Sequence, residues 1–271
     1  MSDAPLVDCH AHVWDESLPF APDAWTRPDY CYTAEDFLAD MDAQGIGFGV
    51  IAGASLFGRN HGYTLGALAR HRRLRGTLVY DPGLHAAALG RLQAAGVVGL
   101  RLQWFRMPFD DLASPAFARA AAALRDHGMH FQLNIDGERF PEVAPAIAAL
   151  GANLVIDHFG WHDPAARLAE PSYRAMLRLL ERESVWVKLS SGFRRPDLDL
   201  PGEYTQDLLR RFGPGKLLWG SDAPFVGHEH AIDYAGTVAL FRRWVPDADA
   251  RRAIGENGYR FYFGNSASAR G

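Results

Sequence analysis

The segment Leu6-Val7-Asp8-Cys9-His10-Ala11-His12-Val13 places two histidines one residue apart in a short apolar run. If this run is a β-strand, the side chains of His10 and His12 leave the same face and converge on one point. In a chain of 271 residues, such an opening strand predicts a barrel whose interior ends in a catalytic mouth. Cys9 alternates with the histidines and is expected to face the outer helices as a small apolar residue.

Short β-branched or leucine-rich runs recur along the chain and alternate with amphipathic stretches of helical spacing. The predicted strands are 6–8, 48–52, 76–80, 97–104, 130–135, 153–157, 185–189 and 217–220, and the helical stretches include 63–71, 115–127, 140–150, 172–182, 204–212 and 232–244. Alternating strands and helices predict a parallel sheet, and eight repeats at this length favour a closed barrel over an open sheet. We therefore predict an α/β fold, a single (β/α)8 TIM barrel over residues 1–271, with its active site at the C-terminal ends of the strands.

Two long loops are expected at the barrel mouth. Residues 13–33 follow the first predicted strand and contain several prolines and aromatic residues, and residues 193–202 follow the seventh. The final region, residues 246–263, is expected to form a helix followed by an aromatic tail that docks on the barrel.

The composition argues against several classes of function. The net charge of −4 and the absence of a lysine- and arginine-rich run argue against a nucleic-acid partner. No segment has the length of a membrane span or the pattern of a secretory signal, so a cytoplasmic protein with no membrane association is expected. The two cysteines, Cys9 and Cys31, lack the spacing of a redox or zinc motif. We expect an enzyme that works as a monomer or a small homo-oligomer.

Polar side chains gather where the predicted strands end. They are His10 and His12, Arg101 and Gln103, Asp157 and His158, Lys188 with Ser190 and Ser191, and Ser221 with Asp222. Buried ionisable groups must be paired or hydrated, so this many at corresponding strand ends is hard to explain by packing alone. The pattern indicates a functional cluster.

Three segments carry a resemblance to a known family. Asp8-Cys9-His10-Ala11-His12, Ile156-Asp157-His158-Phe159-Gly160 and Leu218-Trp219-Gly220-Ser221-Asp222-Ala223-Pro224 resemble signature segments of the amidohydrolase superfamily. More narrowly, the chain is similar to the branch that contains 2-pyrone-4,6-dicarboxylate lactonase. The resemblance covers most of the chain and implies a hydrolase of carboxylic esters.

The resemblance also bears on metal content. Two-metal members of the superfamily use a carboxylated lysine on the fourth strand and a histidine on the fifth, where this chain has Arg101 and then Gln132 and Asn134. A permanent guanidinium opposes a nearby cation, so a two-metal centre is not expected. The resembled lactonase works without metal, which implies that no cofactor is required. A single Zn²⁺ held by His10, His12, His158 and Asp222 is the alternative.

A mechanism follows for these four residues. We expect Asp222 to act as general base on a water that attacks the carbonyl of a cyclic ester, while His10, His12 and His158 orient the water and polarise the carbonyl. Substrate-binding residues are expected to be Arg101, Arg106, Lys188, Arg194, Ser190 and Tyr32. The arginines and the lysine suit a small anionic lactone.

Two differences from the sequence pattern of the lactonase branch change which substrate is expected. Ala223-Pro224-Phe225 stands where the branch has Trp-Pro-His, and Trp161 stands where it has an arginine. These changes suggest fewer substrate carboxylates or a more apolar body, so a sugar-acid lactone, a muconolactone-like compound or another intermediate of aromatic-compound degradation fits as well as the pyrone. The rival hypotheses are a zinc-dependent decarboxylase of the aminocarboxymuconate type and a non-catalytic barrel that binds carboxylates.

Overall fold

The computed structural model describes residues 5–264. Eight parallel strands form one sheet in the order β1 to β8. They are β1 (Val7–Ala11), β2 (Phe48–Ala52), β3 (Leu74–Val79), β4 (Val97–Trp104), β5 (His130–Ile135), β6 (Asn153–Ile156), β7 (Val185–Leu189) and β8 (Leu217–Trp219). The sheet closes where Ala11 bridges Ala223 in parallel, just after β8. The predicted (β/α)8 barrel is therefore confirmed.

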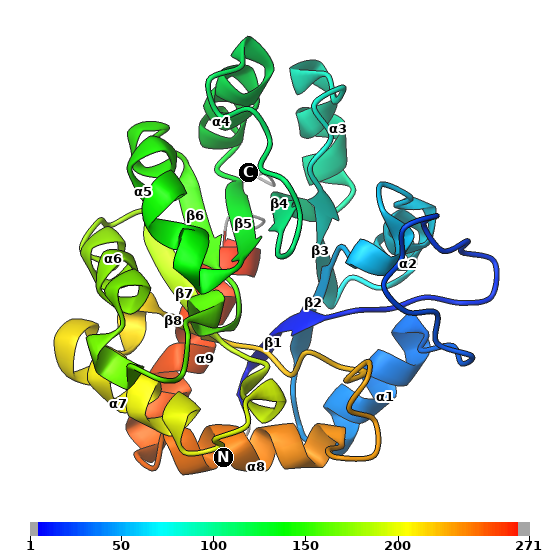
Figure 1. The fold of residues 1–271 in the computed structure, drawn as a ribbon. Coiled ribbons are helices and arrows are strands. Elements are labelled where there is room, and N and C mark those ends of the chain that lie inside the picture. The colour runs from blue at the N-terminus through cyan, green and yellow to red at the C-terminus, as the bar shows by residue number, and fades with distance from the viewer. Residues whose placement is uncertain (1–4, 265–271) are drawn as a thin grey trace.

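Helices surround the strands, as Figure 1 shows. They are α1 (Ala34–Ala43), α2 (Gly62–Arg70), α3 (Leu89–Ala94), α4 (Pro115–Asp126), α5 (Phe140–Ala149), α6 (Pro171–Leu180), α7 (Leu200–Phe212), α8 (Tyr234–Trp244) and α9 (Ala248–Phe263). Helices α1 and α3 were not among the predicted stretches. The start of α1 is nevertheless marked in the sequence, because Thr33 and Asp36 form a capping box. None of the helices that the structure describes has the length and apolar content to cross a bilayer.

The aromatic residues near the C-terminus lie on α9 itself and not on a tail beyond it, which corrects that prediction. Tyr262 and Phe263 pack in a cluster with Val7, Val50 and Val155, residues of β1, β2 and β6. This contact joins the last helix to the barrel.

Strand β1 contains an irregularity that the alternation rule did not anticipate. Its register against β2 shifts between Asp8 and Ala11. Cys9 packs with Leu218, Val155 and the aromatic end of α9, and not against the outer helices as expected. A bulge of this kind lets successive residues share one face, so Cys9 and His10 both lie inside the barrel.

The loop at residues 13–33 is pinned over the barrel mouth as predicted. Trp14 forms an antiparallel bridge with Tyr32, and its indole donates to the Tyr30 carbonyl at 2.8 Å. The loop contributes Trp14 and Trp25 to the wall of the cavity described next.

Candidate active site

A cavity of about 790 Å³ opens at the C-terminal ends of the strands. The predicted site residues that line it are His12, His158, Asp222, Arg101, Arg106 and Arg194. His10, Lys188, Ser190 and Tyr32 are not among its lining residues. The predicted set therefore divides into side chains at the cavity and side chains behind it.

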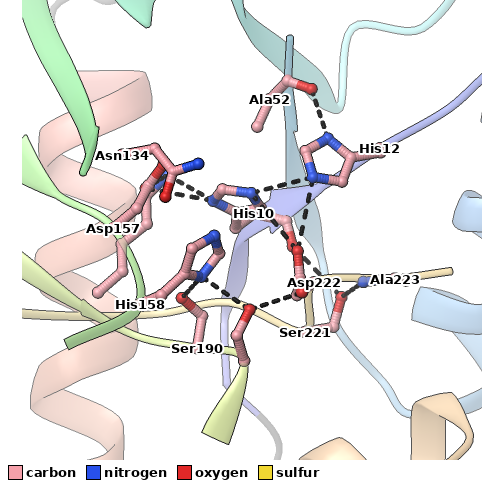
Figure 2. Close-up of polar contacts among 12 residues, drawn as sticks. His10, His12, Ala52, Asn134, Asp157, His158, Ser190, Ser221, Asp222 and Ala223 are labelled. Atoms are coloured by element: carbon pink, nitrogen blue, oxygen red, sulfur yellow. Dashed lines mark hydrogen bonds and ion pairs between the residues drawn. The ribbon is translucent and has the colours of Figure 1, made fainter. Parts of the chain in front are cut away.

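His10, His12 and Asp222 lie close together, as Figure 2 shows, and His12 and Asp222 line the cavity. The two Nε2 atoms are 3.3 Å apart, and Asp222 Oδ1 lies 3.5 Å from Nε2 of His12 and 3.7 Å from Nε2 of His10. His12 Nδ1 lies 2.8 Å from the carbonyl oxygen of Ala52. Because a carbonyl only accepts, His12 carries its proton on Nδ1, and its Nε2 is an acceptor when the ring is neutral.

His10 is fully buried and lies one layer deeper. Its Nδ1 is 3.2 Å from Lys188 Nζ and 3.3 Å from Asp157 Oδ1. Burial lowers the pKa of His10 well below its ordinary value, so the ring is neutral at pH 7. If Nδ1 accepts from Lys188, the proton sits on Nε2 and is directed at His12 and Asp222. In this tautomer Nδ1 accepts from Lys188, and Asp157 Oδ1, at 3.3 Å, interacts with the Lys188 ammonium and not with a ring N–H.

Asp222 is held from two sides. Its Oδ2 accepts from Ser191 Oγ at 2.5 Å and from Arg194 Nε at 2.8 Å, which leaves Oδ1 facing the histidines. Burial alone raises the pKa of Asp222, but Arg194 and His158 outweigh it and hold this pKa well below the usual range. The carboxylate is therefore ionised at neutral pH, as a general base must be.

His158 follows β6 and is positioned by two serines. Its Nδ1 lies 2.9 Å from Ser190 Oγ and 2.8 Å from Ser191 Oγ. Ser191 has one hydroxyl proton and donates it to Asp222, so it accepts from Nδ1 of His158. Burial lowers the pKa of His158 to about 4. The neutral ring thus offers its Nε2 as an acceptor.

Several residues of the site adopt left-handed backbone conformations that are uncommon outside glycine. The φ angles are 56° at Arg106, 53° at His158, 51° at Trp161, 56° at Ser191 and 63° at Asp222. Each such residue costs roughly 1–2 kcal/mol. Strain of this kind persists where the surrounding structure fixes it, and its concentration here supports a functional site.

The sequence placed Asp157 among the polar residues at the strand ends but did not predict a role for it. It is buried and accepts from Arg101 Nε at 3.0 Å and from Gln132 Nε2 at 2.9 Å, while Lys188 Nζ lies 3.3 Å from its other oxygen. The Arg101 guanidinium also donates to the Gly53 carbonyl. Asp157 is therefore the anion that compensates Arg101 and Lys188 inside the barrel.

Three of the predicted substrate-binding residues lie outside the lining of the cavity. Lys188 is fully buried beneath His10, Ser190 is buried against His158, and the Tyr32 hydroxyl donates to Asp40 at 2.7 Å. None of these three side chains lines the cavity. Lys188 instead contacts His10 behind the cavity, and Ser190 contacts His158, which lines it.

The cavity arginines differ in their partners. Arg101 and Arg194 pair with Asp157 and Asp222. Arg59, which the sequence did not single out, lies 3.6 Å from Asp81. The Arg106 guanidinium lies over the Phe105 ring, and in the part of the chain that the structure describes no carboxylate forms an ion pair with this guanidinium, although the Arg106 backbone N–H donates to Asp136. Its exposed guanidinium is the one that can take a ligand anion without breaking an ion pair.

The spacing at the cavity floor also suits one divalent cation. Ligand atoms at 2.0–2.2 Å from a tetrahedral ion are about 3.4 Å apart, close to the separations among His10, His12 and Asp222, which form one candidate metal group. His158 belongs to a second group, with His10 and Asp157. The four residues expected to hold zinc therefore do not form one group, because His158 falls outside the triplet of His10, His12 and Asp222.

Comparisons with known proteins agree with this architecture. The family model described as "Amidohydrolase" matches residues 7–264. A 4-sulfomuconolactone hydrolase of Rhizobium radiobacter is 27% identical over 260 residues, covering 91% of this chain and 86% of the relative.

Two solved structures are similar over nearly their whole length. A protein described as a probable 2-pyrone-4,6-dicarboxylic acid hydrolase from Acinetobacter baumannii, with citric acid bound, has a TM-score of 0.91 at 27% identity and covers 96% of this chain and 99% of its own. An amidohydrolase from Burkholderia multivorans with bound zinc has a TM-score of 0.75 at 25% identity, with coverage of 96% and 99%. Together with the site geometry and the match over almost all described residues, these findings show that the chain belongs to the amidohydrolase family.

Proposed function

We propose that residues 1–271 work as one domain that hydrolyses a small anionic lactone, with Asp222 as general base. The observation that carries this proposal is the position of the Asp222 carboxylate at the cavity, with Oδ2 fixed by Ser191 and Arg194 and Oδ1 beside His12. A positioned carboxylate next to an acceptor imidazole is suited to remove a proton from water. The lactone-hydrolase name of the R. radiobacter relative supports the same reaction.

The proposed hydrolysis has two steps, attack of water and opening of the ring. Water that donates one hydrogen bond to Asp222 Oδ1 and the other to Nε2 of His158 attacks the ring carbonyl, and the first proton passes to Asp222 as the new C–O bond forms. Arg101 and Arg194, which line the cavity, stabilise the developing oxyanion by their positive charge. The ring C–O bond then breaks, and the proton on Asp222 moves to the departing ring oxygen. His10, Lys188 and Ser190 act as positioning residues behind this layer.

The first test is hydrolysis of a panel of carboxylated lactones, followed by ultraviolet absorbance for unsaturated rings and by proton release for saturated ones. Ring opening of at least one member supports the proposal. If no member opens while carboxylates still bind in the cavity, the protein is a binding barrel and the proposal is wrong.

The substrate anion is assigned to Arg106. Its guanidinium lines the cavity without a carboxylate partner in the described chain, and the A. baumannii structure holds citric acid, a polycarboxylate. We expect Arg106→Ala to raise KM about 10- to 100-fold with a smaller change in kcat, because a hydrogen bond to a charged group contributes about 1.5–3 kcal/mol. The matched control is Arg27→Ala, an exposed arginine of the mouth loop that does not line the cavity. An unchanged KM in Arg106→Ala contradicts the assignment.

We propose that this hydrolysis needs no metal. His10, His12 and Asp222 would hold a divalent ion, which would supply a bound water of lowered pKa. Against this stand the cations Lys188 and Arg194, which contact His10 and Asp222. Repulsion between these cations and the ion disfavours binding.

The metal-free proposal predicts that purified protein contains far less than one equivalent of zinc by elemental analysis, and that its kcat/KM is unchanged after chelation and dialysis. One tightly held zinc per chain with activity lost on chelation contradicts it. That result favours the second candidate, a zinc-dependent decarboxylase, which the donor spacing and the zinc-bound B. multivorans structure support.

A further inference from the structure

The cavity mouth carries two large apolar side chains that solvent reaches. Trp25 is 64% exposed and Met107 is 43% exposed, and both line the cavity. They come from different loops, because Trp25 follows β1 and Met107 follows β4. Apolar side chains grouped at the rim of a cavity mark a binding surface more often than scattered ones do.

The wall below this rim is aromatic on several sides. The lining aromatic residues inside the mouth are Trp14, Tyr80, Trp104, Phe105 and Trp161. Phe105 and Trp161 lie with ring centroids 5.3 Å apart, and the Trp161 indole donates to Asn134 at 2.9 Å, which fixes its plane. These aromatic residues line the same cavity as His12, His158 and Asp222 and as Trp25 and Met107.

The indole of Trp25 is available to a ligand. In the described chain no other aromatic ring pairs with it, and its Cη2 atom lies 3.8 Å from where a Cβ of Gly227 would stand. Residue 227 is a glycine with a φ of 78°, a conformation that side-chain-bearing residues rarely adopt. The cavity volume of about 790 Å³ lies in the upper part of the roughly 300–1,000 Å³ range of pockets for drug-sized ligands. A compact lactone acid bound at the floor leaves the outer part unfilled.

We propose that the substrate is a lactone acid with an apolar arm, an alkyl or aryl substituent that lies between Trp25 and Met107 while the ring meets Asp222 and the carboxylate meets Arg106. This inference rests on the proposed function and names its substrate class. The arm leaves water when the lactone binds, and Trp25 and Met107 determine the preference for it.

The test uses five-membered lactone acids that differ in one ring substituent, which is hydrogen, n-butyl or phenyl. We expect kcat/KM to be at least tenfold higher for the butyl and phenyl acids than for the unsubstituted acid, because one methylene in an apolar pocket is worth about 10-fold or more. The phenyl-to-hydrogen ratio should fall about tenfold in Trp25→Ala and in Met107→Ala. It should stay unchanged in Leu198→Ala, the matched control, which is 44% exposed and does not line this cavity.

A binding assay separates failure of this inference from failure of the proposed function. The matching cyclopentanecarboxylic acids have no ester to cleave, and calorimetry measures their affinity directly. If no lactone is hydrolysed but the phenyl analogue binds tenfold more tightly to the wild type than to Trp25→Ala, the apolar arm is supported and lactone hydrolysis is wrong. If lactones are hydrolysed with equal kcat/KM across the series, hydrolysis is supported and the apolar arm is overturned.

Discussion

Replacing Asp222 with asparagine is expected to lower kcat for lactone hydrolysis by about 10²- to 10⁴-fold, the usual contribution of a positioned general base. The asparagine keeps the size of the side chain and an oxygen that can accept from Ser191 or Arg194. It cannot take the proton of the attacking water, because the amide is not basic at neutral pH. The loss should therefore appear in kcat with a small change in KM.

The matched control is Asp23→Asn, which removes an exposed carboxylate that lines the cavity mouth. Its kcat should stay within about twofold of the wild type, since it lies outside the histidine cluster. Circular dichroism and thermal melting of both variants establish that they are folded. A kcat in Asp222→Asn above one tenth of the wild-type value means that another group removes the proton.

The sequence was sufficient to predict which strand ends meet, because the carboxyl ends of parallel strands gather at one end of a barrel. His12, His158 and Asp222 follow β1, β6 and β8 and do reach one cavity. Seven of the eight strands lie within two residues of their predicted ends, because their apolar runs are bounded by polar residues and glycines, but the first was predicted as 6–8 and extends to Ala11.

The depth of each side chain could not be predicted in the same way. Lys188 and His158 both follow the rule for strand ends, yet Lys188 lies beneath His10 and His158 faces the cavity. Their height along the barrel axis depends on strand tilt and stagger, which the spacing of apolar residues does not encode. The register shift in β1 is a further example. An irregular strand has the same types of residue as a regular one, so the apolar pattern does not reveal where the register shifts.

Loop residues were the hardest to assign. Arg59 reaches the cavity from the segment after β2, where the sequence has no distinctive pattern around it. Tyr32 was expected at the substrate, but its hydroxyl donates to Asp40 on α1, a helix that was not predicted. The direction of such side chains is fixed by tertiary contacts, which a single sequence does not display.

The buried charges around Asp157 make this residue decisive for stability. Burial raises the pKa of Asp157, but Lys188, His10 and Arg101 outweigh burial and hold it well below the ordinary value. A depressed carboxyl pKa adds stability above the unfolded-state pKa, and this stability is lost as the pH falls through the folded-state pKa. The ion pairs are dry, since neither Lys188 nor Asp157 has an exposed side chain. Removing the anion therefore leaves two cations without compensation.

Asp157→Asn is accordingly expected to lower the free energy of unfolding by about 3–5 kcal/mol, the usual result of breaking a buried pair from one side. At about 2–4 °C per kcal/mol this lowers Tm by at least about 6 °C. Burial already lowers the pKa of Lys188, and the loss of Asp157 lowers it further. The folded variant then binds fewer protons than its unfolded chain at alkaline pH, so its stability rises with pH. The difference in free energy of unfolding between the variant and the wild type should therefore shrink between pH 7 and pH 10.

Two further variants test this explanation by thermal melting at both pH values. Asp42→Asn, the matched control, breaks an exposed pair with Arg73 and should leave Tm nearly unchanged. Lys188→Met combined with Asp157→Asn removes both charges and should recover part of the lost Tm, because the buried ammonium no longer lacks a partner. If the loss of Tm is the same at both pH values and is not reduced by Lys188→Met, then packing around residue 157, and not the charge on Lys188, causes the loss of stability.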